Sequence, residues 1–394
     1  MRSYRPLGTI MCRPRAPVAA VFLSVVIAGL LRTTETGGAQ SANRALPEEA
    51  RHPATNPSDA RKVELGRLLF WDPILSGRKD VACATCHHPE FGYAENLDVS
   101  IGVNGLGLGT RRRFDAPNAI PFVKRNSQTI LNVAFNGIDQ SGQDDPAKAP
   151  MFWDLRAVSL EAQALEPIKS FEEMRGDAYT EAEALNAVTA RLAGVAEYRT
   201  LFNRAFGGSR PVTAENVGKA LAAFERTLTA NNAPFDRYMR GDLTAMTIEQ
   251  VRGMEQFNRV GCANCHTGPM FSDFKAHVLG VPDNAKLSSS DAGIASSYAF
   301  RTPTLRNLRS TAPYMHNGTF QTLQEVLGFY RTGRRRPLNP NVQRDRLDPL
   351  LAQVNVGRSR FDILEFLNAL NDDGFDKQIP SRVPSGLRPG GNIQ

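Results

Sequence analysis

Cysteine is scarce in this sequence, and where it occurs narrows what the chain can do. The 394 residues contain five cysteines, of which Cys12 precedes an apolar run near the N-terminus. The other four fall in two copies of one short motif, CATCH at 83–87 and CANCH at 262–266. Beyond the N-terminal region, therefore, no cysteine is left for a structural disulfide or for a catalytic nucleophile.

The excess of positive charge is mostly an N-terminal feature. The formal net charge is +7, but residues 1–39 contain five arginines and one glutamate, a net of +4, which leaves 7 − 4 = +3 for residues 40–394. So small an excess does not indicate a nucleic-acid partner. Two local basic runs remain, 111–113 and 334–336. Such runs are typical of solvated loops, and a docked partner is the alternative interpretation.

The first 39 residues have the pattern of an export signal. Four arginines precede the apolar run 18–31, and the small residues Gly37, Gly38 and Ala39 follow it. The run is too short to span a bilayer comfortably. We predict a signal peptide over 1–39 and a periplasmic protein that contacts the membrane only if this leader stays uncleaved.

Alternating patterns typical of strands are scarce, whereas helical spacing recurs. From Ser159, apolar residues follow a helical period until Pro167 interrupts it, and further helical runs cover 180–205 and 214–229. The sequence therefore predicts a mainly α fold.

Capping signals predict where further helices begin. Thr247 predicts the start of a helix that leads to the second motif. The capping box formed by Thr322 and Glu325 predicts a short helix through Tyr330. A last amphipathic helix is expected over 361–370, before a loosely held tail rich in Pro, Gly and Ser.

The C-x-x-C-H motif is the attachment signal of c-type haem. Its two thiols add to the vinyl groups of the porphyrin, and the adjacent histidine ligates the iron. A C-x-x-C pair alone also occurs in redox dithiols and in zinc sites. Two copies, each followed by histidine, in a chain predicted to be exported favour two covalent haems. The predicted haem-binding residues are Cys83, Cys86, His87, Cys262, Cys265 and His266.

The other face of each iron decides function, because a sixth protein ligand favours electron transfer whereas an open face permits peroxide chemistry. The remaining histidines are His52, His88, His277 and His316. Methionine or tyrosine side chains are alternative ligands. Few side chains are therefore available as sixth ligands for the two irons.

Six longer stretches carry a resemblance to a known family. They are LGRLLFWDPILSG at 65–77, CATCHHPEFGYA at 83–94, RNSQTILNVAFNG at 125–137, FWDLRAVSLEAQALEPIKSFEEM at 152–174, GCANCHTGPMFSD at 261–273 and RTPTLRNLRSTAPYMHNGTFQTLQEVLGFY at 301–330. Together they resemble the bacterial di-haem cytochrome c peroxidase family, and within it the MauG-like branch.

This resemblance implies two cytochrome c-like domains, each with one covalently attached haem. After the signal peptide, the predicted segments are an extended lead-in over 40–60, an N-terminal peroxidatic haem domain over 61–210, a C-terminal electron-transfer haem domain over 211–377 and a flexible tail over 378–394.

In the family the first haem has an open pocket, whose acid–base glutamate matches Glu173 and whose glutamine and proline match Gln163 and Pro167. The chemistry agrees, because cleavage of peroxide needs a group that takes a proton from one oxygen and returns it to the other. Burial raises a carboxyl pKa toward the range in which such a transfer is efficient. Without the resemblance, Glu173 has the character of an ordinary surface glutamate.

The resemblance also implies a relay and a metal ion between the haems. Trp153 matches a tryptophan that passes oxidising equivalents, although a large core residue is the simpler interpretation. A calcium ion is implied at Asn126, Thr311 and Pro313, where a side-chain oxygen and two backbone carbonyls suit a hard cation.

The sixth ligand of the second haem separates the branches of the family. Tyr330 stands where the MauG-like branch has tyrosine and reductively activated peroxidases have methionine. Packing in a core is the alternative for Tyr330, and Met315 is a rival ligand. A removable histidine after the first motif is expected in reductively activated members, and residues 89–125 contain none.

The resulting prediction is a periplasmic di-haem peroxidase that reduces hydrogen peroxide at the first haem and relays oxidising equivalents through the second to an electron donor or a protein substrate. A reductively activated peroxidase with a small cytochrome c donor and a non-enzymatic di-haem electron carrier are the alternatives. Val260 replaces the tryptophan through which MauG proteins oxidise a partner, so cofactor maturation in methylamine dehydrogenase is not inferred.

Overall fold

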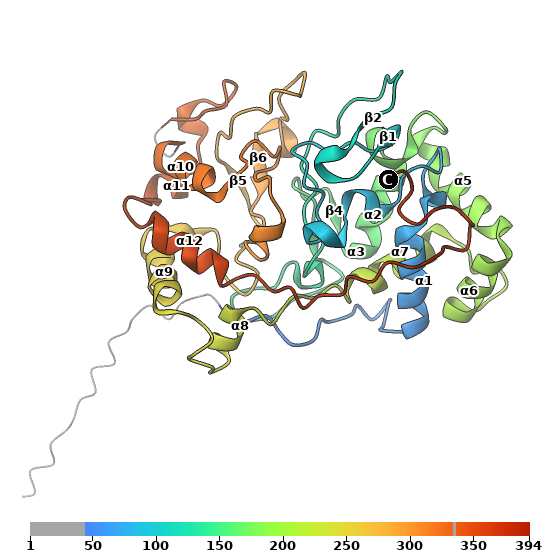
Figure 1. Ribbon diagram of the computed structural model, residues 1–394, viewed down its shortest axis with the longest axis horizontal. Helices are drawn as coiled ribbons and strands as arrows, with labels where there is room; N and C mark the ends of the chain where they lie inside the picture. Colours follow the sequence, from blue (N-terminus) through green and yellow to red (C-terminus); the bar gives the residue numbers. More distant parts are fainter. Residues whose placement is uncertain (1–43, 334–335) are drawn as a thin grey trace, which may run out of the picture. The chain divides into compact units, whose positions relative to one another are not determined.

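The computed structural model describes residues 44–394 except 334–335, and helices dominate these residues (Figure 1). The predicted signal peptide and the first residues of the lead-in lie outside the described range. The helices are α1 (Ala60–Trp71), α2 (Cys83–Cys86), α3 (Leu160–Gln163), α4 (Glu166–Lys169), a π-helix (Phe171–Arg175), α5 (Glu181–Gly194), α6 (Ala196–Phe206), α7 (Ala214–Glu225), α8 (Pro234–Met239), α9 (Ile248–Arg259), α10 (Leu323–Gly333), α11 (Pro349–Gln353) and α12 (Arg360–Asn368). Within the described residues, no helix combines the length and hydrophobicity that crossing a membrane requires.

Strands contribute little to the described part of the chain. The antiparallel pairs are β1 (Gly105–Leu106) with β2 (Arg113–Phe114), β3 (Pro150–Met151) with β4 (Ala157–Val158), and β5 (Ala276–Val278) with β6 (Ala299–Arg301). The prediction of a mainly α fold is confirmed.

One hydrophobic core lies around α1 and α7 and includes side chains of α5 and α6. The helices α1 and α7 approach so closely that a Cβ on Gly66 would lie 1.9 Å from the carbonyl oxygen of Ala220. Only glycine allows that approach. Because Cys83 packs against this core, the core holds the first motif in place.

A second, separate core lies between α9 and α12. Phe235, Phe257, Phe271 and Phe366 form edge-on or tilted aromatic contacts there, with ring centroids 5.0–6.2 Å apart. Such contacts stabilise a core beyond the burial of apolar area. Cys262 of the second motif packs against this core. One core beside each motif suits the predicted pair of haem domains, whose boundary near 210 stays a prediction.

Two expected helices differ from the structure. The prediction that Pro167 interrupts a helix is wrong, because α3 already ends at Gln163 and Pro167 lies in the first turn of α4. Proline is tolerated there, since the missing N–H would have no partner within the helix. The run 180–205 divides into α5 and α6 at Val195, which has extended backbone angles.

Both capping predictions are confirmed. The Thr247 hydroxyl accepts a hydrogen bond from the Gln250 backbone N–H at 3.3 Å, at the start of α9. The Thr322 hydroxyl accepts from the Glu325 N–H at 3.2 Å, and the Glu325 carboxylate accepts from the Thr322 N–H at 2.9 Å. These bonds fix the start of α10, which continues past Tyr330.

The C-terminal tail is bound more closely than the sequence predicts. The Gly390 N–H donates to the Trp71 carbonyl at 2.7 Å, and the Thr85 hydroxyl donates to the Gly390 carbonyl at 2.9 Å. Val383 is buried in the first core. Residues 378–394 therefore pack against the first motif, because hydrogen bonds and an apolar anchor offset the loop-forming composition.

Candidate functional site: two cysteine–histidine motifs on one cavity

The first motif presents a neutral imidazole in a defined tautomer. Cys83–Cys86 form the single turn α2, and His87 follows it. The Nδ1 atom of His87 lies 3.1 Å from the Tyr93 carbonyl oxygen, so Nδ1 carries the proton and donates it. Burial lowers the pKa of His87 to about 4, which keeps the ring neutral. The lone pair on Nε2 is therefore available to a metal.

The second motif repeats this geometry. The helix α9 ends just before Gly261, whose φ of 92° begins the turn that carries Cys262. The Nδ1 atom of His266 lies 2.9 Å from the Phe271 carbonyl oxygen, and burial lowers its pKa. A backbone carbonyl thus orients each imidazole, as is usual for histidines that ligate metals.

Burial disfavours ionisation of the thiols of Cys83, Cys86 and Cys262. All four cysteines are free, and burial raises the pKa of Cys83 and of Cys262 to about 12. A redox dithiol or a zinc site needs thiolates, which an electropositive environment favours and apolar burial opposes. These surroundings therefore fit thiols that become thioethers on a haem.

A single cavity of about 590 Å³ connects the two motifs, with Cys83, Cys86 and His87 in its wall as well as Cys262, Cys265 and His266. Its lining is mainly apolar, as a porphyrin requires. The cavity thus has a ligating histidine and two anchoring thiols at each of two places.

Arg301 supplies an independent test of whether haem fits this cavity. Its side chain is 6% exposed and lines the cavity, and it donates to the Phe152 carbonyl and the Gln128 amide oxygen but to no carboxylate among the described residues. Burial lowers its pKa to about 10. Buried arginines normally have an anionic partner, as Arg306 has in Asp236 at 2.8 Å. A porphyrin with two carboxylates would provide one.

Glu173 faces the cavity from the π-helix Phe171–Arg175. Its backbone packs so closely on Gly102 that a Cβ there would lie 2.3 Å from the Glu173 carbonyl oxygen. Burial raises the pKa of the Glu173 carboxyl to about 7, although the Arg156 guanidinium opposes this rise. Gln163 at the end of α3 and Pro167 in α4 line the same cavity. The three residues predicted for the first pocket therefore share one cavity with His87.

Trp153 is held in the cavity wall by hydrogen bonds of its backbone and its indole. The indole N–H donates to the Asn126 carbonyl at 3.0 Å, and the Trp153 carbonyl accepts from the Arg301 N–H at 2.7 Å. The ring lies edge-on to His316 with centroids 6.5 Å apart. It is 8% exposed and lines the cavity, so it is both a packed residue and a neighbour of the site.

The three residues predicted to bind calcium lie close to Trp153 or in the cavity wall. The NH₂ group of the Asn126 side chain donates to the Leu97 carbonyl at 2.7 Å. Its Oδ1 atom accepts no hydrogen bond from the described residues. Thr311 and Pro313 line the cavity, and within that same part of the chain their carbonyls accept no hydrogen bond. Oxygen atoms without donors fit a hard cation.

Tyr330 and Met315 both line the cavity. Tyr330 packs with Cys262 against the second core, and burial raises its pKa above the usual range, with the nearby thiols adding to the rise. Met315 has a positive φ of 73°, which is uncommon for a non-glycine residue. Tyr330 is therefore placed beside the second motif, and the choice of ligand stays a prediction.

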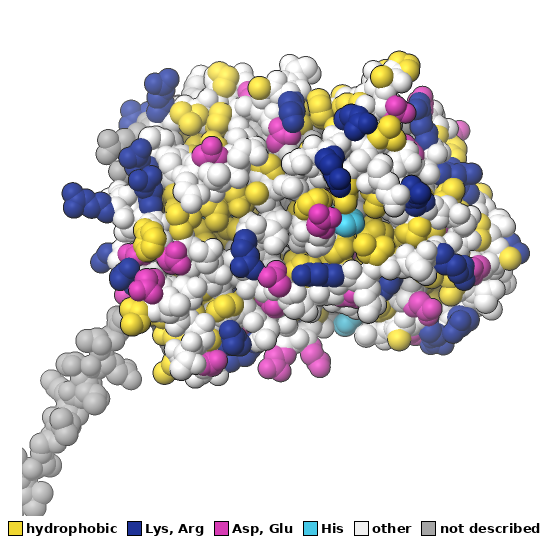
Figure 2. Space-filling model, viewed as in Figure 1, with side chains coloured by type: hydrophobic (Ala, Val, Ile, Leu, Met, Phe, Trp, Pro, Cys, Tyr) yellow, Lys and Arg dark blue, Asp and Glu magenta, His cyan; other side chains and the backbone are white. Residues whose placement is uncertain are grey.

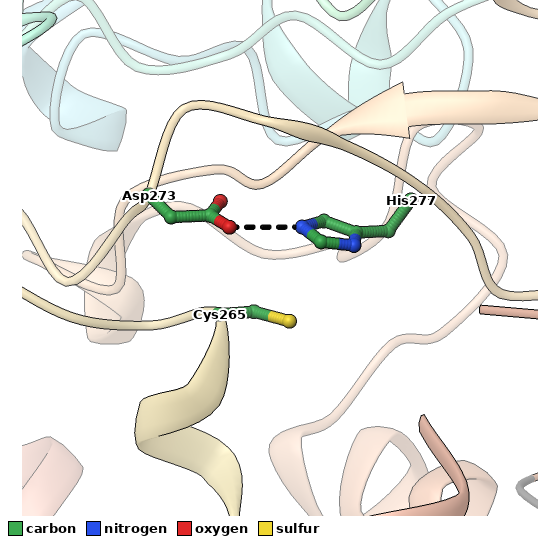
Figure 3. A group of neighbouring side chains, drawn as sticks. All are labelled: Cys265, Asp273 and His277. Carbon is green, nitrogen blue, oxygen red and sulfur yellow. Dashed lines mark hydrogen bonds and ion pairs between the residues drawn. The ribbon is translucent and has the colours of Figure 1, made fainter. Parts of the chain in front are cut away.

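A buried histidine beside the second motif was not recognisable as part of the site. His277 on β5 lies between two carboxylates, with Nδ1 2.6 Å from Asp348 and Nε2 3.0 Å from Asp273. The hydrogen bond to Asp273 is the main reason that its pKa rises to about 11. The Cys265 sulfur lies within 4.8 Å of the Asp273 carboxylate and of a His277 ring nitrogen (Figure 3). Because Cys265 belongs to the haem motif, this cluster is a charged neighbour of the second haem rather than a separate metal site.

A further buried carboxyl group in the cavity wall belongs to Glu225. Glu225 at the end of α7 is 5% exposed, and its Oε2 atom has no hydrogen-bond partner among the described residues. Burial raises its pKa to about 8. No sequence signal distinguishes Glu225 from a surface glutamate, because only the packing of α7 turns it inward.

Comparison with known proteins agrees with this site. The model of a family described as "Di-haem cytochrome c peroxidase" matches residues 60–244. Methylamine utilization protein MauG of Methylorubrum extorquens is 35% identical over 341 residues, which cover 82% of this chain and 87% of that protein. Cytochrome c551 peroxidase of Pseudomonas aeruginosa is 32% identical over 295 residues, 72% of this chain and 75% of the relative.

Solved structures show the same fold. The crystal structure of a MauG-like protein associated with microbial copper homeostasis matches with a TM-score of 0.66 and 26% identity, over 83% of this chain and 95% of that chain. The di-haem peroxidase BthA of Burkholderia thailandensis matches with a TM-score of 0.62 and 21% identity, over 88% and 97%, and this likeness concerns the fold alone. With relatives of this similarity over most of its length, the chain belongs to the di-haem cytochrome c peroxidase family and is a di-haem peroxidase.

Proposed function

We propose that the chain reduces hydrogen peroxide in the pocket of His87 and passes the oxidising equivalents through Trp153 and the second motif to an external donor or protein substrate. The observation that carries this proposal is Glu173, a carboxyl with a pKa of about 7 in the wall of the cavity that His87 enters. A group that titrates near neutral pH both takes and returns a proton efficiently.

Glu173 handles one proton in this proposal. Haem, when bound at His87, supplies the iron that coordinates peroxide and exchanges electrons. The Glu173 carboxylate removes a proton from one peroxide oxygen and returns it to the other as the O–O bond breaks. Hydrogen peroxide, two protons and two electrons yield two water molecules, so a complete turnover needs two electrons from outside.

Gln163 and Pro167 shape the space that peroxide enters. Gln163 offers an amide that both donates and accepts hydrogen bonds, whereas Pro167 presents an apolar surface without an N–H. Together they allow a small polar molecule beside Glu173 and exclude a protein side chain from the iron.

Trp153 and Tyr330 belong to the relay half of the proposal. Trp153 lines the cavity that both motifs share, and in this proposal it passes electrons from the second motif toward the first. Tyr330 would ligate the iron held at His266 and, as an anionic oxygen ligand, would stabilise its oxidised states. Met315 in that role would instead favour a reductively activated peroxidase with a small cytochrome c donor, and Met315 also lines the cavity.

The proposal also covers a calcium ion, the domain boundaries and the cellular location. Calcium binds between the haems at Asn126, Thr311 and Pro313. The haem domains extend over 61–210 and 211–377. The protein works in the periplasm after removal of the leader, 1–39, as two covalent haems and the export pattern of the sequence favour.

Electron paramagnetic resonance of the ferric, haem-loaded protein tests the proposal. We expect one high-spin and one low-spin haem, and both signals should fall together after one equivalent of hydrogen peroxide. Two low-spin signals that peroxide leaves unchanged would identify a di-haem electron carrier instead. If only the high-spin signal falls, the result supports reaction with peroxide at the first haem but contradicts electron transfer between the two haems.

A further inference from the structure

One segment of the chain differs from the rest in charge. Residues 331–360, the basic segment, contain eight arginines and two aspartates, a net of 8 − 2 = +6. Residues 40–394 as a whole carry +3, so the remainder of that range carries 3 − 6 = −3. The positive charge beyond the N-terminal region is therefore concentrated in this one segment.

The arginines of the basic segment that the structure describes are exposed and form no ion pair. Six of them lie within the described residues, namely Arg331, Arg336, Arg344, Arg346, Arg358 and Arg360, and all six are exposed. In that part of the chain none forms an ion pair, whereas other exposed arginines do, such as Arg309 with Asp373 at 2.6 Å. Lys and Arg side chains also gather over α10 and α11 in the surface view (Figure 2). Among the described residues, no carboxylate lies close enough to pair with these six arginines.

The basic segment also forms part of the cavity wall beside the second motif, a region called the second pocket below. Its inward side chains Val342, Leu350, Leu351 and Val354 line the cavity. Its backbone is tied to the second motif, because the Asn355 N–H donates to the Val260 carbonyl at 2.8 Å. The segment thus presents arginines to solvent and mainly apolar side chains to the second pocket.

We propose that the basic segment is the docking face for an acidic one-electron redox protein that exchanges electrons with the second haem. This inference rests on the proposed function and specifies its partner. Two reduced partner molecules supply the two electrons that one peroxide consumes, and each leaves oxidised by one electron. The segment places such a partner next to the second pocket.

Charge complementarity is the reason for choosing this partner. Unpaired like charges on a rim accelerate encounter with an oppositely charged protein by about 10- to 10³-fold, and salt screens the effect. Nucleic acid and anionic membranes also bind basic surfaces, but neither exchanges electrons with the pocket behind this segment. They are therefore outcomes that the experiment must separate.

The experiment compares two sets of charge reversals in the haem-loaded protein. The test variant carries Arg336→Glu, Arg344→Glu, Arg346→Glu and Arg358→Glu. The control variant carries Arg111→Glu, Arg113→Glu, Arg204→Glu and Arg210→Glu, four exposed arginines outside the segment that form no ion pair among the described residues. Both variants change the net charge equally. Absorption spectra and thermal unfolding confirm that each retains its haems and fold.

Stopped-flow oxidation of reduced plastocyanin, an acidic probe, is followed after peroxide addition, with mitochondrial cytochrome c as the basic probe. At low ionic strength the test variant should oxidise plastocyanin about tenfold or more slowly than the unmodified protein, while the control changes about twofold or less. The difference should shrink as salt is added. Poly-glutamate should compete with plastocyanin for the basic segment and inhibit its oxidation by the unmodified protein.

Several results would overturn the inference. One is equal slowing of plastocyanin oxidation in both variants. Another is that the unmodified protein oxidises the basic probe faster than the acidic one. A third is a plastocyanin rate that does not depend on salt, while anionic vesicles or duplex DNA bind through the segment. Peroxide consumption with hydroquinone, a small neutral reductant, separates the two proposals. If hydroquinone supports no turnover, the proposed peroxidase function fails. If it does and the acidic probe shows no preference, only the docking face fails.

Discussion

The two C-x-x-C-H motifs share one pattern and one imidazole geometry, yet the chain surrounds them differently. Backbone carbonyls of Tyr93 and Phe271 orient His87 and His266 in the same way. Around the first motif, a π-helix turns the Glu173 carboxyl into the cavity. Around the second, α10 places the Tyr330 phenol there. The two motifs are alike, and segments remote in the sequence supply different side chains around each of them.

The titration behaviour of these two groups explains the division. Burial raises the pKa of Glu173 to about 7, so both of its protonation states are accessible near neutral pH. Burial also raises the pKa of Tyr330, above the range in which a phenol ionises in water. A free Tyr330 would therefore stay protonated, and only coordination to a cation would ionise it. The first pocket suits proton transfer, whereas the second suits ligation.

Removing the acid–base group should have the largest effect on this comparison. We expect Glu173→Gln to slow the reaction with peroxide by about 10²- to 10⁴-fold, because the amide cannot take and return a proton. Stopped-flow spectroscopy measures the rate, and the absorption spectrum verifies that both haems remain. Glu172→Gln is the matched control. Equal rates for the two variants would remove Glu173 from the mechanism.

The pH dependence of the peroxide reaction should report the same group. Glu173 acts as a base when ionised, and its pKa of about 7 means that the ionised fraction rises with pH through 7. Below this value we expect the rate to fall about tenfold per pH unit, and above it to reach a plateau. The profile of Glu173→Gln should lack this inflection. An inflection that persists in this variant would belong to another group. Glu225 is then the first candidate, because it lines the cavity and burial raises its pKa to about 8.

The ligand of the second haem offers a change confined to one pocket. We expect Tyr330→Phe to alter the low-spin resonance and raise the potential of one haem, because an anionic oxygen ligand is lost. The rate of the first peroxide step should stay within about threefold, since Glu173 is untouched. Met315→Leu should leave the low-spin resonance unchanged. The opposite result for the pair would assign the ligand to Met315 and the chain to the reductively activated kind.

Features that depend on neighbouring residues could be predicted from the sequence, whereas features that depend on packing could not. The motifs and the caps at Thr247 and Thr322 are local patterns, and the structure contains them. The ion pair of His277 with Asp348 joins residues 71 positions apart, which no local pattern reveals. Whether Glu225 is buried likewise depends on which face of α7 meets the cavity.

The burial of Arg301, which indicates an anionic cofactor, could not be predicted from the sequence either. Its position in a matched segment gives no indication that it is buried without a carboxylate. The roles of Glu173, Trp153 and Tyr330 were inferred through resemblance alone, and the structure adds that all three line one cavity. Elementary patterns therefore locate the haems, and three-dimensional packing identifies the charges around them.

The smallest expected effect concerns how firmly the second pocket holds its ligand. The capping box at Thr322 satisfies N–H groups at the start of α10, and Tyr330 lies about two turns further on. Thr322→Ala should lower the free energy of unfolding by about 1 kcal/mol, because one N-terminal N–H loses its acceptor. Chemical denaturation measures this loss, and Thr322→Ser, which keeps the hydroxyl, should restore most of it.

Because α10 is anchored along its length by Leu327 and Phe329, both buried, the low-spin resonance should not change. If the resonance shifts with Thr322→Ala but not with Thr322→Ser, the cap itself positions Tyr330, and the second pocket is held by the start of its helix rather than by its core.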